Sequence, residues 1–239
     1  TASRFLGIQN LLNICSQVAI IAIIAIGMTM VIITGGIDLS VGSLIALASV
    51  VTALMIRDLF GGTGAGIGGL FVASLAGILV CMCVGLITGA FVTFIKIPPF
   101  IVTLSMMLIA RGMASILTEG VSVEELPTAY NKLGRDADLL NIPNSVLLML
   151  TLYIIAHLLM TRTSLGRYIY AVGGNAEAAR LSGVPINQVL LFVYSMTGLL
   201  AGLGGIVMAS MLNAGSAKYG DMYELYVIAA VVVGGTSLS

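Results

Sequence analysis

Long uncharged apolar runs constrain this chain more than any other feature of its sequence. Residues Phe5–Ile37 contain no Asp, Glu, Lys or Arg, and Leu11–Thr34 is long enough to cross a hydrocarbon core of about 30 Å as a helix. Only 8% of all residues are charged, whereas soluble domains carry about 25%. Because backbone polar groups in lipid must be satisfied internally, these runs predict an all-α, polytopic transmembrane helical bundle.

The apolar runs divide a single transmembrane domain, residues 1–239, into successive membrane spans. We predict them near 11–34, 39–56, 70–95, 99–117, 145–160 and 187–212, with an incomplete span at 223–239. No signal peptide or leading span precedes the first of them, and the last stops partway through an apolar run. We therefore expect the chain to be truncated at both ends.

Two short stretches are predicted to interrupt the membrane helices. Gly35-Gly36 is suited to end one helix, and Asp38 is suited to cap the next, close to Ser40. Pro98-Pro99 breaks the chain again, with Pro99 at a first helical position before Phe100. A capping role would by itself account for the presence of Asp38 at this position. Because irregular backbone at membrane depth is tolerated only inside protein or along a cavity, these residues are also candidates for a translocation path.

A polar, glycine-punctuated island at Thr161–Pro185 separates two apolar runs and must face water. Within it, Gly173-Gly174 is predicted to turn and Asn175 to cap a helix of about two turns, closed by Gly183. Glu177 and Arg180 are spaced to pair at i,i+3. A helix this short persists only when it is docked, either on its own membrane domain or on a soluble partner.

Charge places the island inside the cell. It contains three arginines and one glutamate, whereas Glu119–Asn144 contains two basic and five acidic residues. Lys96 falls on the island's side of the membrane when the spans alternate. By the positive-inside rule the island is cytoplasmic and Glu119–Asn144 lies outside.

Glycines in the third span predict a close helix contact. Gly85 and Gly89 form a small-xxx-small pair that lets a neighbouring helix approach. The alternative is the ordinary tolerance of membrane helices for glycine.

The sequence shows no catalytic or metal-binding constellation. Cys15, Cys81 and Cys83 lie in apolar runs without CxxC spacing and are interpreted as small packing residues, and His157 stands alone in an apolar run. Arg111 is interpreted as snorkelling toward the membrane interface. The chain has no Walker A glycine loop, so we expect a non-enzyme without cofactors of its own and no metal site. The formal net charge of zero removes the electrostatic case for nucleic acid.

A faint internal repeat relates the two ends of the chain. VIITGGIDLS at 31–40 and VVVGGTSLS at 231–239 each lead an apolar run into Gly-Gly and then Leu-Ser. Repeated halves with interrupted helices recur in transporters, although chance also explains so short a match.

Four blocks in order resemble one transporter family. They are GGIDLSVGS at 35–43, KIPPFIVTLSMM at 96–107, TSLGRYIYAVGGNAEAARLSGV at 163–184 and YELYVIAAVVVGGTSLS at 223–239. Together they are similar to the membrane permease subunit of bacterial carbohydrate ABC importers, in particular the ribose, xylose and galactose permease group. The resemblance covers essentially the whole chain and implies an ABC importer permease in the bacterial inner membrane.

The resemblance also implies partners and a coupling segment. It implies a permease homodimer, two ABC subunits that bind ATP and Mg²⁺ on the cytoplasmic side, and a periplasmic binding protein that delivers a monosaccharide. The coupling segment would fall on Leu165–Val184. Its candidate residues are Leu165, Gly166, Arg167, Gly174, Asn175, Glu177, Ala178, Arg180 and Gly183.

Two other function classes stay open at this point. An ion-coupled secondary transporter would also use broken helices and an intramembrane acid, but it needs no docked loop. A membrane scaffold would carry no substrate at all. Pentoses, hexoses, inositol and a furanosyl signalling molecule all remain compatible with the sequence.

Overall fold

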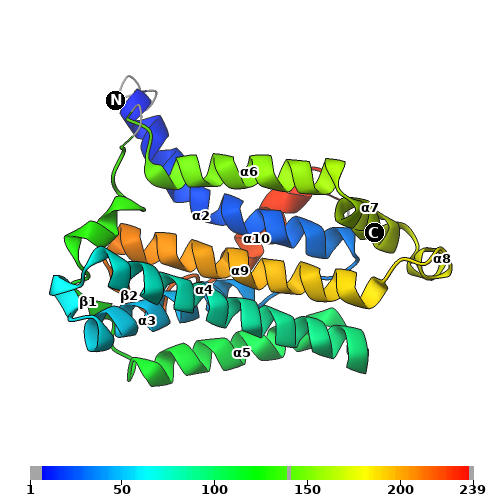
Figure 1. Ribbon diagram of the computed structural model, residues 1–239, viewed down its shortest axis with the longest axis horizontal. Coiled ribbons are helices and arrows are strands. Elements are labelled where there is room, and N and C mark those ends of the chain that lie inside the picture. The colour runs from blue at the N-terminus through cyan, green and yellow to red at the C-terminus, as the bar shows by residue number, and fades with distance from the viewer. Residues whose placement is uncertain (1–6, 139–140, 237–239) are drawn as a thin grey trace.

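The protein consists mainly of long, roughly parallel helices (Figure 1). The computed structural model describes residues 7–138 and 141–236. Within these residues, six helices are long and apolar enough to cross a membrane. They are α2 (Ile8–Ile33), α3 (Val41–Leu59), α4 (Ile67–Ala90), α5 (Pro99–Leu117), α6 (Asn144–Arg162) and α9 (Ile186–Leu212). The predicted all-α transmembrane bundle is therefore confirmed.

Shorter elements connect the long helices. They are the helices α7 (Ser164–Gly174), α8 (Ala176–Leu181) and α10 (Tyr223–Val233), the 3-10 turns Gly62–Gly64 and Thr128–Lys132, and a π-helix at Phe91–Ile95 that extends α4. Strands β1 (Val123–Glu124) and β2 (Ala214–Gly215) pair antiparallel. The last three residues of the predicted 223–239 span lie outside the described residues.

Helix α3 occupies the centre of the bundle. Every residue from Val41 to Val50 is buried, so protein surrounds the first half of this helix on all sides. Helices α5 and α6, in contrast, bury only a small share of their residues, as expected of surfaces that meet lipid or a partner.

Glycines bring α4 and α9 into close contact. A Cβ at Gly85 would overlap the backbone of Tyr194, and one at Gly198 would overlap the carbonyl of Cys81. The close approach predicted from Gly85 and Gly89 is confirmed: a Cβ at Gly89 would lie 3.3 Å from Leu191 Cα. Cys81 is buried at this contact, whereas Cys15 and Cys83 are exposed, so the packing interpretation was wrong for those two.

The two halves of the proposed repeat end their helices in the same way. After α2, Gly35 N–H donates to Ile32 O and Gly36 N–H donates to Val31 O, which confirms the predicted helix end. After α10, Gly235 N–H donates to Val232 O and Thr236 N–H donates to Val231 O. Gly35 (φ +78°) and Gly235 (φ +103°) supply the left-handed residue that this termination needs. The left-handed residue is the first glycine of Gly35-Gly36 but the second of Gly234-Gly235, so the two helix ends share a motif without aligning the Gly-Gly pairs of the proposed repeat, and Ser237–Ser239 lie outside the described residues.

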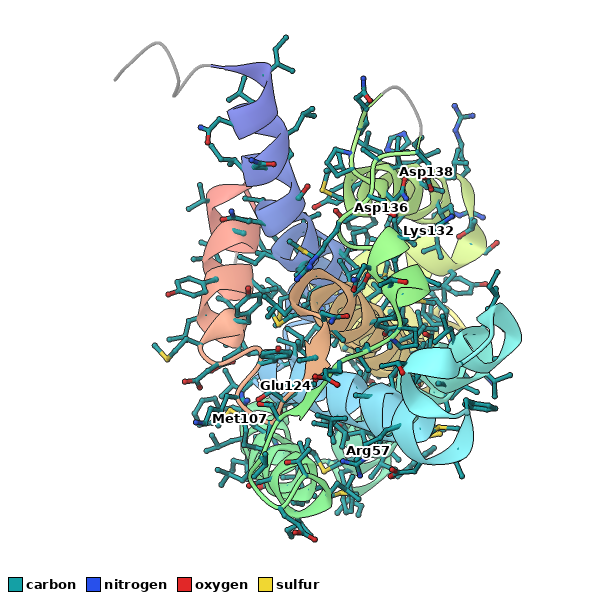
Figure 2. All side chains as sticks on the ribbon, turned by 90° about the vertical axis from the view of Figure 1, so that its left-hand side faces the viewer. Arg57, Met107, Glu124, Lys132, Asp136 and Asp138 are labelled. Carbon is teal, nitrogen blue, oxygen red and sulfur yellow. The ribbon has the colours of Figure 1, made fainter. Side chains whose placement is uncertain are left out.

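The two polar segments lie at opposite ends of the bundle. Helix α8 marks one end and the β1–β2 pair marks the other (Figure 1). Figure 2 looks onto the second end, where Arg57, Glu124, Lys132 and Asp136 are labelled. This separation is what the alternation of spans predicts for segments on opposite faces of a membrane.

Candidate coupling element and translocation path

Helix α8 is capped at both ends by its own residues. The Asn175 Oδ1 accepts a hydrogen bond from Ala178 N–H at 2.9 Å. At the other end, Gly183 N–H donates to Arg180 O and Val184 N–H donates to Ala179 O, both at 3.0 Å, with Gly183 at φ +83°. The predicted N-cap and glycine end are both confirmed, and they explain how six residues hold a helix.

An exposed ion pair runs along α8. Arg180 Nη2 lies 2.6 Å from Glu177 Oε1, and Arg180 Nε donates to Glu177 Oε2 at 3.0 Å. The Arg180 guanidinium holds the pKa of Glu177 below its usual value, so the pair stays charged at neutral pH. The predicted i,i+3 pair is confirmed.

Most of α8 is uncovered, including its one large apolar side chain. Ala179 is buried, but Ala178 is exposed and Leu181 is 75% exposed. Leu181 was not among the sequence-predicted coupling residues. The available signal was its i,i+3 spacing from Ala178, which places two apolar residues on the same side of a water-facing helix.

A second helix, α7, directly precedes α8 in the chain, and the sequence analysis did not predict it. Its buried face consists of Gly166, Ile169 and Val172, and Thr163 Oγ1 caps it by accepting from Gly166 N–H at 3.2 Å. The predicted Gly173-Gly174 turn was wrong, because both glycines end α7 as helical residues. The signal for α7 was present in the apolar spacing 165, 169 and 172 after a threonine cap.

At Gly173, helix α7 packs closely against the end of α2. A Cβ at Gly173 would overlap the carbonyl group of Ile33, the last residue of α2. The chain then passes from Ile33 directly into the interruption at 34–40. The coupling candidates are therefore in backbone contact with the element that leads to the predicted path.

Asp38 and Ser40 are brought together inside the bundle. The Asp38 Oδ1 accepts from Ser40 N–H at 2.9 Å and from the Ser40 hydroxyl at 2.6 Å, and both residues are 1% exposed. The predicted helix cap was wrong in detail, because Ser40 is the N-cap of α3 and Asp38 precedes it by two residues. Asp38 instead stabilises the turn that starts α3.

The second carboxylate oxygen of Asp38 has no hydrogen-bond partner among the described residues. Directly before Asp38 in the chain, the Tyr194 hydroxyl of α9 lies against Gly36, and Thr103 Oγ1 of α5 donates to Ile37 O at 3.2 Å. Pro99 occupies the first position of α5, as predicted. Pro98 and Phe100 are exposed on the outside of the bundle, so the path candidates divide into a buried pair and an exposed helix start.

Another interrupted stretch, 213–222, meets the start of α3 and was not predicted. Cβ atoms at Gly42 and Gly220 would each overlap the carbonyl group of the other glycine. Arg111 Nη1 donates to Ala217 O at 2.6 Å and to Tyr219 O at 2.8 Å. The snorkelling interpretation of Arg111 was therefore wrong, because the guanidinium holds this stretch in place.

Replacing Asp38 with alanine is expected to destabilise the protein by about 1–3 kcal/mol, because it leaves the buried Ser40 N–H and hydroxyl without their acceptor. Asp38→Asn keeps an acceptor oxygen and should lose less. Thermal unfolding of the purified variants in detergent measures the difference. Equal stability of the two variants would show that the Asp38 hydrogen bonds do not hold the turn.

Replacing Arg111 with methionine is expected to raise amide hydrogen exchange in residues 216–222 by about tenfold, because two carbonyl groups lose their charged donor. Arg57→Met is the matched control, since the ion pair of Arg57 within residues 7–138 and 141–236 is with its exposed sequence neighbour Asp58. Unchanged exchange in Arg111→Met would contradict the clamping role.

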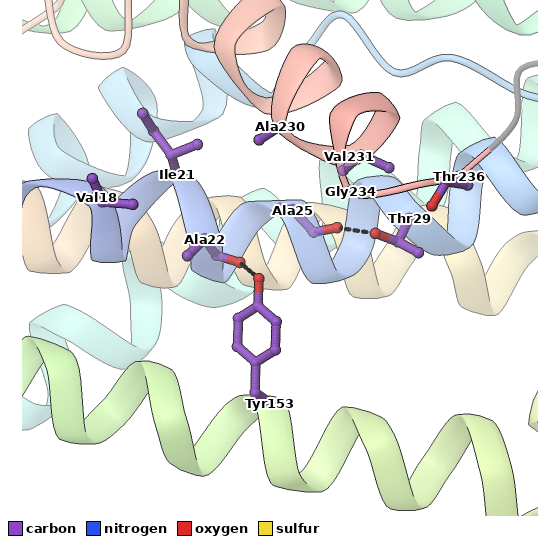
Figure 3. A pocket seen from close by; sticks show the side chains of 10 residues that line it. All are labelled: Val18, Ile21, Ala22, Ala25, Thr29, Tyr153, Ala230, Val231, Gly234 and Thr236. Atoms are coloured by element: carbon purple, nitrogen blue, oxygen red, sulfur yellow. Dashed lines mark hydrogen bonds between the residues drawn. The ribbon is translucent and has the colours of Figure 1, made fainter. Parts of the chain in front are cut away.

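A cavity of about 430 Å³ between α2, α6 and α10 is not built for a sugar (Figure 3). Two of the hydroxyls on its wall are engaged with carbonyl groups of α2: Tyr153 donates to Ala22 O at 3.1 Å and Thr29 donates to Ala25 O at 2.6 Å. Most of the remaining lining is aliphatic. The translocation candidates therefore remain those around the 34–40 interruption.

Comparison with known proteins extends the resemblance noted in the sequence. The family model for "Branched-chain amino acid transport system / permease component" matches residues 10–239. The ribose import permease protein of Escherichia coli K12 is 41% identical over 99% of this chain and 72% of its own length. That of Bacillus subtilis 168 is 41% identical (98% and 71%), and the xylose transport system permease protein of E. coli K12 is 32% identical (100% and 74%). No solved structure matches.

Proposed function

The chain belongs to the branched-chain amino acid transport system permease family, as a permease of carbohydrate ABC importers, and from this premise we propose that it passes a monosaccharide into the cytoplasm at the expense of ATP. It is a multi-pass inner-membrane protein and a transporter subunit, and its relatives are permeases and not enzymes. An ABC importer permease works with an ATPase and a binding protein. The steps that follow, from docking to release, are our proposal.

The exposed, self-capped α8 is the observation that supports ATP coupling best. A six-residue helix with both ends capped and Leu181 largely uncovered is suited to dock in a groove of another protein. We propose that α8 docks on the ATPase subunit, with Leu165, Gly166 and Arg167 of α7 holding it in position. Gly174, Asn175 and Gly183 would set its geometry, and Glu177, Ala178 and Arg180 would face the partner.

ATP and Mg²⁺ would be bound and hydrolysed entirely on the partner subunit. Closure of two ATPase subunits would push on α8 in each copy of a permease homodimer. The backbone contact between Gly173 and Ile33 would pass the movement to the end of α2 and then to the interruption at 34–40. Each state would be favoured by its differential contacts with ATP and with the loaded binding protein.

The path itself is proposed to run beside the 34–40 interruption and the start of α5. Asp38 and Ser40 are buried in this conformation, so they would meet substrate only after the helices move apart. The cytoplasmic end of the path, where α5 begins, would be shaped by Pro98, Pro99 and Phe100. The unpartnered Asp38 oxygen is a natural acceptor for a sugar hydroxyl. The ribose and xylose named for the relatives make a pentose the first substrate to test.

Uptake of radiolabelled ribose and xylose into proteoliposomes tests this function. The proton gradient is collapsed with an uncoupler while ATP is supplied with the cognate ATPase and binding protein. Continued uptake is expected. Uptake that stops with the gradient and needs no ATP would indicate an ion-coupled transporter instead, and uptake of neither sugar under any condition would remove the pentose assignment.

A further inference from the structure

A cavity that the transport proposal does not use lies next to α8, and apolar and polar side chains both line it. It has a volume of about 600 Å³ and opens between the π-helical end of α4 and the segment that joins α8 to α9. Its wall is formed by Val92, Thr93, Lys96, Arg180, Val184, Pro185, Ile186, Asn187, Gln188 and Leu190.

The charged residues that line this cavity are both basic. Lys96 and Arg180 reach it from different elements, and no aspartate or glutamate is among its lining residues. Glu177 offsets Arg180 through the ion pair on α8, but Lys96 takes part in no ion pair in the described part of the chain. The cavity therefore favours an anion.

Two further groups favour an anion at the same place. The first turn of α9, a helix of 27 residues, lines the cavity with Ile186, Asn187 and Gln188, and a helix N-terminus carries partial positive charge. Thr93 is 7% exposed, and its hydroxyl has no hydrogen-bond partner among the described residues. The hydroxyl oxygen is covered in this conformation, so a rotation of the Thr93 side chain would present this donor to an anion in the cavity.

The surroundings point to a lipid as the carrier of that anion. Phe94 and Ile95, on the same π-helical turn as Thr93, are 61% and 59% exposed in a chain that spans a membrane. An acyl chain would pack on these side chains while its headgroup reached Lys96. We propose that this cavity binds the phosphate group of an anionic phospholipid, with Lys96, Thr93 and the start of α9 as its binding residues.

Retention of lipid by the full-length permease tests the proposal. The protein is placed in nanodiscs of phosphatidylcholine with increasing fractions of phosphatidylglycerol, and bound phosphatidylglycerol is counted by native mass spectrometry after release from the nanodisc. Lys96→Gln is expected to weaken retention about fivefold, the effect of one basic residue near an anionic lipid. Thr93→Val should also weaken it, without loss of folding, because the replaced hydroxyl has no partner.

Lys218→Gln is the matched control, because it removes one exposed lysine from the 213–222 stretch, outside this cavity. Retention by this variant should equal that of the unmodified protein. If Lys96→Gln and Thr93→Val both retained as much phosphatidylglycerol as the unmodified protein, the proposal would be overturned. Displacement of the lipid by millimolar inorganic phosphate would overturn the lipid assignment and identify a site for a free phosphate.

Discussion

Replacing Leu181 with aspartate is expected to lower ATP-driven sugar uptake by about 10- to 100-fold, because a leucine buried on docking contributes about 1.5–3 kcal/mol. Leu181 is 75% exposed, so the substitution should leave the fold and the thermal unfolding of the isolated permease unchanged. The measurements are ATP-dependent uptake in proteoliposomes and copurification of the ATPase with the permease.

The conservative variant Leu181→Met is the control for this prediction. Methionine preserves apolar contact area and should retain most of the uptake and of the bound ATPase. Full uptake by Leu181→Asp would mean that the exposed face of α8 does not dock on the ATPase.

Replacing Gly173 with alanine is expected to lower uptake by about tenfold while ATP hydrolysis continues. The added Cβ would overlap the carbonyl group of Ile33, and backbone cannot give way as a flexible side chain does, so α7 must move off the end of α2 at a cost of about 1–3 kcal/mol. The docked α8 would then move without moving the 34–40 interruption. Uptake and ATP hydrolysis are measured on the same preparation.

Gly112→Ala makes the same change in a helix where a Cβ meets nothing within 4 Å. It should leave both uptake and thermal stability unaltered. Normal uptake in Gly173→Ala would contradict a transmission route through α7 and α2.

Local chemistry made much of the fold predictable. The Asn175 cap, the Gly183 end and the Gly35-Gly36 end depend on residues within a few positions of one another, and the structure confirms all three. The close contact of α4 with α9 was also predictable, because glycine spacing reports directly how near two helices can come.

Long-range contacts explain what the sequence did not reveal. Arg111 binds carbonyl groups more than a hundred positions away in the chain, so its apolar neighbours made it look like an interfacial residue. Gly173 looked like a turn residue because its contact with Ile33 joins segments far apart in sequence. Asp38, in contrast, was misassigned on a local detail, because Ser40 is the N-cap of α3 and donates two hydrogen bonds to Asp38.

The same limit applies to the candidate site. The two ends of α8 followed from the island's sequence, whereas α7 was missed and the exposure of Leu181 required the fold that leaves it uncovered. The buried pair of Asp38 and Ser40 was identified as a candidate, but the contacts of Tyr194 with Gly36 and of Thr103 with Ile37, beside this pair, come from distant helices.

Cysteine crosslinking at Ala178 tests the central claim most directly. Ala178 is exposed on α8, and the native cysteines Cys15, Cys81 and Cys83 are replaced first. Ala178→Cys is then oxidised against a panel of single cysteines in the cognate ATPase, with and without ATP. We predict crosslinks whose yield changes with ATP. No crosslink at any ATPase position, together with uptake that persists after ATP depletion, would contradict the assignment of α8 as the coupling element of an ATP-driven permease.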